Sequence, residues 1–286
     1  MVELAFRLAD LEVRVRSPAA APIDAVAARY RRCARAGGQA APDVTVDIEP
    51  APELDASPPR GKAAAALRAE PAPGEPPGLR LSRADVRGEV RVPRDGPVRA
   101  RFRAARPATT ETAIRTALAI ALPARGGLVL HASAAALGPA ADAPAVALCG
   151  DSGSGKTSIA AALVAATGGA KLADELLVVR ARPGGWRVFV APFYDSEPLP
   201  FGASFPLAGW CALAPAESGP PVRLAAAQAM AAVPAAALAY AAGGPLGEAL
   251  LDTAARLAVD VPCWRLPSRD RSAAAAALLG ALEGRA

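Results

Sequence analysis

The sequence predicts an α/β protein in which a mixed sheet with hairpin-joined strands carries a glycine-rich phosphate loop. Residues 150–157 match a phosphate-loop motif and stand between an apolar run and a segment without helix breakers. The short connections at 138–144 and 183–185 are typical of hairpins. Residues 1–105 alternate apolar and polar positions and predict a small α+β domain, so residues 106–286 form the phosphate-loop domain.

Composition argues against several classes of protein. The chain has 286 residues and a net charge of +5 without a block of like charges, and only 4% of its residues are aromatic, which argues against nucleic-acid binding. The four cysteines form no C-x-x-C pair and the chain has one histidine, so the sequence indicates no zinc site. The cysteines are predicted to be reduced thiols. No apolar run reaches bilayer length and no secretory leader is apparent, so a cytoplasmic protein without a membrane contact is expected.

The first domain is expected to hold several short strands and one helix. The expected strands are 2–8, 11–15, 44–48, 79–81, 86–92 and 98–102, the last three as a small antiparallel sheet, and the expected helix is 23–35. Arg99, Arg101 and Arg103 alternate, so a strand would place all three on one face. That face is either a docking surface for an acidic partner or substrate, or a solvated strand face of an arginine-rich protein.

The second domain is expected to alternate strands and helices around the motif. Strands are expected at 126–137, 145–149, 171–180, 186–190 and 261–266. Helices are expected at 109–122, 158–166, 224–242, 246–258 and 272–282, with interruptions at Pro234 and at 243–245.

The motif residues have the chemistry of a phosphate cradle. Glycines let the backbone turn its N–H groups toward a phosphate chain, which would also face the positive end of the following helix. Lys156 would reach the outer phosphates and the Thr157 hydroxyl would be a Mg²⁺ ligand. Lysine is rare in this chain, at positions 62, 156 and 171 only, which indicates that a compact charge matters where it is kept. The nucleotide-binding set is Gly150, Asp151, Ser152, Gly153, Ser154, Gly155, Lys156, Thr157 and Ser158.

An acidic pair follows the motif at an unusual distance. Asp174 lies only 17 positions after Thr157. The pair Asp174-Glu175 stands at the beginning of an apolar strand, whereas the acid on the Mg²⁺ side of common parallel-sheet NTPases stands at the end of one. The acids would then lie beside the phosphate loop, on strands joined as hairpins. The alternative is a capping or turn pair without chemistry.

These motifs together resemble the catalytic domain of HPr kinase/phosphorylase and its kinase relatives, a group similar in fold to phosphoenolpyruvate carboxykinase. The matching positions are His131-Ala132 on an apolar strand, the loop 150–157, and Ala173-Asp174-Glu175, within residues 110–195. The dipeptide Pro192-Phe193 is also similar to a feature of HPr-kinase-like proteins that are found near peptide-modification systems. Two features depart from the family: Glu175 replaces its second aspartate, and the glycine-rich signature of true HPr kinases is absent.

The resemblance implies an ATP- and Mg²⁺-dependent kinase that phosphorylates a hydroxyl of a protein, peptide or small molecule. It assigns Lys156 to the phosphates, and Thr157 with Asp174 or Glu175 to Mg²⁺, while the other acid acts as the base. By resemblance Glu175 is the base, although its longer side chain leaves the opposite assignment open. His131 would orient these groups, or alternatively be a core histidine.

Two other functions remain open, a nucleotide-binding regulatory module without catalysis and a carboxykinase-like enzyme of small molecules. Members of this group often assemble, which leaves a homo-oligomer open. Further residues are open as phosphate clamps or acceptor contacts, and each is otherwise a surface residue: Arg125, Arg180, Arg182, Arg269, Arg271, Asp195 and Glu197.

Overall fold

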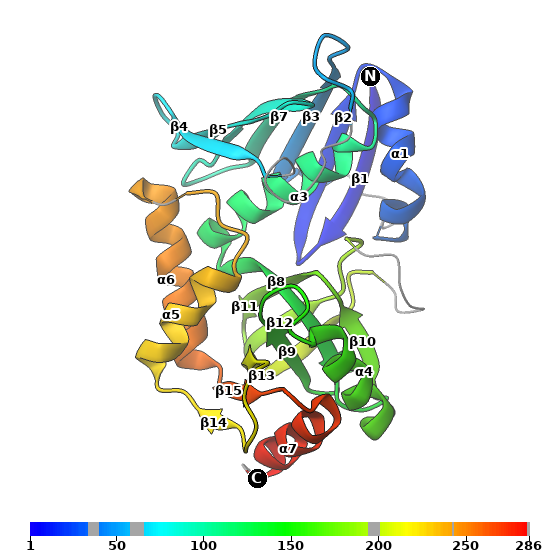
Figure 1. Ribbon diagram of the computed structural model, residues 1–286. Helices are drawn as coiled ribbons and strands as arrows, with labels where there is room; N and C mark the ends of the chain where they lie inside the picture. Colours follow the sequence, from blue (N-terminus) through cyan, green and yellow to red (C-terminus); the bar gives the residue numbers. More distant parts are fainter. Residues whose placement is uncertain (34–39, 58–65, 194–200, 242, 285–286) are drawn as a thin grey trace. The chain divides into compact units, whose positions relative to one another are not determined.

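The computed structural model describes residues 1–33, 40–57, 66–193, 201–241 and 243–284 (Figure 1). In this part of the chain the fold is mixed α/β, with two mixed sheets and six α-helices. The chain divides into two compact units. Unit 1 contains residues 1–125 and 239–250, and unit 2 contains residues 126–238 and 251–286.

Unit 1 is built on a seven-stranded sheet with the order β1-β2-β3-β7-β6-β5-β4. The predicted antiparallel pairing of β5, β6 and β7 is confirmed, and the parallel pairs β2–β3 and β3–β7 extend it into a mixed sheet. The predicted strands are present, and β4 was missed because it is only five residues long and contains Pro71. The strands are β1 (Val2–Leu8), β2 (Leu11–Ser17), β3 (Val44–Pro50), β4 (Arg68–Ala72), β5 (Gly78–Arg83), β6 (Val86–Arg91) and β7 (Val98–Ala104).

Two helices cover one face of this sheet (Figure 1). Helix α1 (Ala20–Tyr30) packs on β1 and β2, and a 3₁₀ turn follows at Arg31–Cys33. Helix α3 (Thr109–Ala121) packs on β3, β6 and β7, and a second 3₁₀ turn follows at Pro123–Arg125. The contacts of α3 explain why unit 1 extends to Arg125 and not only to residue 105: the apolar side of this helix, including Ile114 and Leu118, completes the core of the first sheet.

A buried aspartate ties the β5–β6 turn to the start of α3. Asp85 is 1% exposed and accepts hydrogen bonds from Arg83, Arg106 and Thr109 at 2.6–3.1 Å. Burial alone would raise the pKa of Asp85, but these donors outweigh it and lower the pKa to about 2.

We expect the free energy of unfolding to fall in acid because Asp85 becomes protonated. Because its folded pKa lies below the ordinary 3.8, its contribution is complete above that pH and is lost as the pH falls toward 2. The difference in unfolding free energy between the wild type and Asp85→Asn should therefore shrink by about 2 kcal/mol between pH 5 and pH 2. Chemical denaturation of both proteins measures it, with Asp24→Asn, an exposed position on α1, as the control. A difference that is constant with pH would contradict the assignment.

Unit 2 holds an eight-stranded sheet in which two long strands change partners. The first half of β8 (Gly127–Ala136) pairs with β11 (Leu176–Arg182), and its second half pairs with β9 (Ala145–Cys149) and β10 (Ala170–Ala173). Strand β13 (Ser204–Ala214) likewise pairs first with β12 and then with β9 and β15. The remaining strands are β12 (Gly185–Phe189), β14 (Val222–Arg223) and β15 (Cys263–Pro267).

Both predicted hairpins of this unit are confirmed, since β8–β9 and β11–β12 are antiparallel neighbours. Two predictions were wrong in detail. The strand expected over 171–180 is two strands, β10 and β11, which are separated at Asp174-Glu175. The helix expected over 224–242 is shorter, because α5 (Ala226–Ala236) ends after Pro234 and the chain becomes extended at Ala237, which bridges to Leu130 of β8.

Helices α4 (Lys156–Thr167) and α7 (Arg271–Glu283) pack on each other and on the sheet of unit 2. Their shared core includes Leu148, Leu163, Trp264 and Leu278. The unit boundary passes through α6 (Gly244–Asp260). No helix in the described ranges is both long and apolar enough to cross a membrane. All four cysteines are buried, and none of them forms a disulfide among the described residues.

Candidate functional site

The glycine-rich segment forms a tight loop between β9 and α4. Gly153 and Gly155 have φ values of +83° and +100°, in the left-handed region that favours glycine. Within the loop the Ser154 N–H donates to the Asp151 carbonyl oxygen at 3.1 Å. Gly155 is the N-cap residue of α4, so the positive end of that helix opens on this loop. The predicted strand–loop–helix context is therefore present.

Lys156 is buried against the same loop. It is 7% exposed, and its ammonium group donates to the carbonyl oxygens of Gly150 and Asp151 at 2.6 and 2.9 Å. Burial lowers the pKa of Lys156, while the nearby negative charges, including Asp174 and Glu175, oppose that shift. The lysine thus lies over the loop with acids in electrostatic range.

The Asp174 carboxylate accepts hydrogen bonds from three side chains of the site. Asp174 is 8% exposed, and its Oδ1 accepts from the hydroxyls of Thr157 and Ser133 at 2.6 and 2.8 Å. The Lys171 ammonium donates to Oδ2 at 3.2 Å. Burial would raise the pKa of Asp174, but these three donors outweigh it and the net shift is downward. The carboxylate is therefore held ionised and fixed beside the first turn of α4.

Strand pairing explains how a residue 17 positions beyond Thr157 returns to it. Helix α4 leads directly into β10, and β10 pairs antiparallel with β8, opposing Ala173 to Ala134 with a register shift between Lys171 and Ala173. This irregularity comes just before Asp174, whose side chain reaches both Ser133 of β8 and Thr157 of α4.

Glu175 and His131 lie next to this cluster at the position where β8 changes partners. The Ala132 N–H donates to the Glu175 carbonyl oxygen at 3.1 Å, and His131 is the register partner of Leu176. Both side chains are exposed. His131 shares its strand face with Ser133, two residues on, which contacts Asp174.

The other residues considered as phosphate clamps or acceptor contacts belong to several different elements. Arg180 and Arg182 lie toward the opposite end of β11 from Glu175. Arg125 belongs to unit 1, where it donates to the Gly96 carbonyl oxygen. The Arg269 backbone N–H donates to the Glu217 carbonyl oxygen, in the turn before α7. Asp195 and Glu197 lie outside the described residues.

Arg271, the remaining clamp candidate, does reach the loop. A Cβ built on Gly155 would lie 2.5 Å from Arg271 Nε and 3.2 Å from its Cδ. The side chain of Arg271 therefore packs over the N-cap of α4, and it makes no ion pair with the described residues. Glycine is required at position 155 both for its backbone conformation and for this close approach.

Two contributors to the site, Ser133 and Lys171, were not expected from the sequence. Ser133 stands in an apolar strand, and the available signal was its two-residue spacing from His131. Lys171 was noted only as one of three lysines; its spacing of three from Asp174 was the missed signal. Two of the three lysines thus lie in this site, and Lys62 lies outside the described residues.

The residues present fit a phosphate chain with a hard cation. Hydroxyl and carboxylate oxygens from Thr157 and Asp174 are the ligand types that Mg²⁺ takes, usually one or two from the protein with phosphates and waters completing the shell. In the described part of the chain, no group of three or more His, Cys, Asp or Glu side chains that could hold a metal ion is found. The buried Ser154 hydroxyl in the loop has no hydrogen-bond partner among the described residues.

No protein-family model matches the chain, and no curated protein matches it either.

Proposed function

We propose that this protein is an ATP- and Mg²⁺-dependent phosphotransferase that moves the γ-phosphate to a hydroxyl of a protein, peptide or small-molecule acceptor, on a fold of the HPr-kinase type. One observation carries the proposal: a phosphate-loop threonine and a conformationally fixed carboxylate, Thr157 and Asp174, are 2.6 Å apart beside a lysine that covers the loop. A capping or turn pair would not require the carboxylate to be buried with three donors on it.

The loop residues bind and orient the nucleotide in this proposal. The N–H groups around Gly153 and Gly155 surround the β-phosphate, and the α4 N-terminus adds its positive end. Lys156 leaves the carbonyls of Gly150 and Asp151 and donates to the β- and γ-phosphates, where negative charge increases in the transition state.

Asp174 and Thr157 are the pair that would hold Mg²⁺, and when bound the ion would neutralise charge on the β- and γ-phosphates. Asp174 suits this task because its three donors keep it ionised and fix its direction. Ser133 and Lys171 are then positioning residues, since they act on the carboxylate and not on the substrate.

Glu175 is the better candidate for the base because its carboxylate is exposed and can meet an acceptor. It takes the proton from the acceptor hydroxyl as that oxygen forms a bond to the γ-phosphorus and the bond from phosphorus to the β–γ bridging oxygen breaks. The products are the phosphorylated acceptor and ADP. His131, exposed on the neighbouring strand, orients the acceptor or the γ-phosphate.

Arg271 adds a cation on the open side of the loop. A guanidinium over the N-terminus of a helix is unfavourable beside Lys156 until an anion is bound there, because all three are positive. An unpaired arginine in this position favours a polyphosphate ligand over an uncharged one.

The test is to incubate the full-length chain with γ-labelled ATP, Mg²⁺ and a panel of hydroxyl acceptors, including proteins and peptides encoded near it. We expect labelled acceptor and stoichiometric ADP, and no transfer when EDTA removes Mg²⁺. ATP binding without any turnover across the panel would favour the regulatory-module alternative. Transfer to a carboxylate or to a keto acid would favour a carboxykinase-like enzyme.

A further inference from the structure

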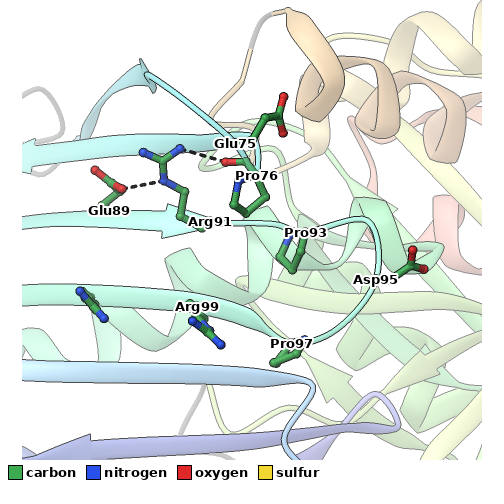
Figure 2. Close-up of a pocket in the computed structure, with 9 residues that line it drawn as sticks. Glu75, Pro76, Glu89, Arg91, Pro93, Asp95, Pro97 and Arg99 are labelled. Carbon is green, nitrogen blue, oxygen red and sulfur yellow. Dashed lines mark hydrogen bonds and ion pairs between the residues drawn. The ribbon is translucent and has the colours of Figure 1, made fainter.

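A cavity of about 510 Å³ lies in unit 1, and nothing in the proposed transferase uses it. Its floor is the sheet face opposite α1 and α3 and is lined by Arg91 of β6 and by Arg99 and Arg101 of β7. Figure 2 shows Arg91 and Arg99 on this floor. Its walls come from the turns that precede β5 and β7 and include Pro76, Pro93 and Pro97. The turn of Pro76 and the end of β6 are tied together because the Val92 N–H donates to the Pro77 carbonyl oxygen.

Arg91 is held in place by its neighbours and helps to shape the cavity. Its guanidinium donates to the carbonyl oxygens of Pro73, Gly74 and Pro76 at 2.8–3.1 Å, and its Nε donates to Glu89 at 2.6 Å (Figure 2). These bonds fix the wall turn to the sheet. The Arg91 side chain is therefore a structural part of the cavity and not a free contact for a ligand.

Arg99 and Arg101 differ from it, because neither makes a hydrogen bond or an ion pair with the described residues through its side chain. The cross-strand neighbours of Arg99 are Thr45 and the cationic Arg91, so no acid stands opposite it.

Arg101 does have acids opposite it, but other arginines already occupy them. Its cross-strand neighbours are Asp47 and Glu89. Asp47 accepts two hydrogen bonds from Arg16, at 2.7 and 3.0 Å, and Glu89 is paired with Arg91 and Arg80. The adjacent guanidinium groups of Arg99 and Arg101 on the cavity floor are therefore not neutralised by a neighbouring acid.

The acids at the rim do not neutralise that charge. Glu75 and Asp95 are exposed, and Figure 2 shows both carboxylates directed away from Arg99. Like charges opposite each other on neighbouring strands are destabilising, so the Arg91–Arg99 pair costs stability that an anionic ligand would restore. A strand face that was merely solvated would not need two unpaired arginines beside a cavity walled by prolines.

We propose that this cavity is a docking site for an acidic peptide segment, whose carboxylates pair with Arg99 and Arg101 while its apolar atoms lie on the three prolines. Guanidinium groups pair well with carboxylates in a planar, two-bonded geometry. A nucleic-acid strand fits less well, because its phosphates are regularly spaced and would also meet Glu75, Glu89 and Asp95, whereas a peptide can place uncharged residues beside these acids. The site is independent of the proposed transferase, since it needs neither nucleotide nor the phosphate loop.

The test is fluorescence anisotropy of the full-length chain without nucleotide. The probe is a fluorescein-labelled peptide that alternates glutamate with proline, compared with the same peptide carrying glutamine for glutamate. We expect saturable binding of the acidic probe only, weakened by added salt. The double variant Arg99→Gln/Arg101→Gln should bind roughly tenfold more weakly, the order expected when two exposed charge contacts are lost.

The matched control is Arg31→Gln/Arg68→Gln, which removes two exposed arginines that line no part of the cavity and have no ion pair among the described residues. It should bind the probe as the wild type does, and circular dichroism should show both double variants folded. Equal binding by Arg99→Gln/Arg101→Gln and wild type would overturn the proposal, as would equal weakening by the control. Tighter binding of a labelled oligothymidylate than of the acidic peptide would also overturn it, in favour of a phosphate-backbone ligand.

Discussion

Replacing Lys156 with alanine is expected to lower the rate of γ-phosphate transfer by roughly 10²–10³-fold, the loss found when one donor to a developing negative charge is removed. The reason is that no other described lysine lies on the phosphate loop: Lys171 is engaged with Asp174. Lys156→Arg should also be impaired, because a planar guanidinium does not reproduce a compact ammonium bonded to two loop carbonyls. The measurement is the initial rate of transfer at saturating ATP and Mg²⁺.

The control for this prediction must separate lost chemistry from a collapsed loop. Arg68→Ala removes an exposed cation from β4 and should leave transfer unchanged. Thermal melting and the binding of a fluorescent ATP analogue should show that Lys156→Ala is folded and still takes up nucleotide, more weakly. A Lys156→Ala protein with wild-type transfer would remove the phosphate loop from the proposed mechanism.

The two acids are expected to fail in different ways. Asp174→Asn keeps the shape but loses the charge that Thr157 and Lys171 face, so transfer should fall at least about 10²-fold and require more Mg²⁺. Glu175→Gln should lower the rate by roughly 10²–10⁴-fold, the range for a lost general base, with the Mg²⁺ requirement unchanged. Initial rates over a Mg²⁺ titration and a pH series measure both effects.

A matched pair of conservative variants sharpens this comparison. Glu175→Asp keeps a carboxylate and should recover part of the rate, whereas Asp174→Glu should not, because the buried position has no room for a longer side chain among its three donors. If the Mg²⁺ shift appeared in Glu175→Gln instead, the roles of the two acids would be reversed. If both Asp174→Asn and Glu175→Gln transferred phosphate like the wild type, the site itself would be wrong.

The glycine-rich loop at 150–157 and its strand and helix were the part of the candidate site that local sequence could predict. Its glycines, the apolar strand before it and the helix after it all lie within about two dozen consecutive residues, and each depends on neighbours in sequence. The hairpins on either side followed from connection length in the same way. The acidic pair was predicted from order and spacing, and its contact with Thr157 depends on how β10 pairs with β8.

The remaining features depend on tertiary contacts that local patterns do not carry. Strand β13 was missed because Pro206 and Gly209 interrupt its apolar residues, yet it pairs in succession with β12, β9 and β15. Gly209 is there because a Cβ would lie 2.4 Å from the Trp264 ring. Ser133 and Arg271 could not be assigned for the same reason, since their contacts join segments far apart in the chain.

The two carbonyl oxygens that hold Lys156 have a thermodynamic consequence for any polyphosphate that enters the loop. The ammonium group already has acceptors, so it exchanges partners on ligand arrival and adds no net hydrogen bonds. Ground-state affinity should therefore understate what this residue contributes to turnover, because its advantage increases only as charge accumulates on the transferring group. A modest dissociation constant and a fast chemical step would coexist in such a pocket.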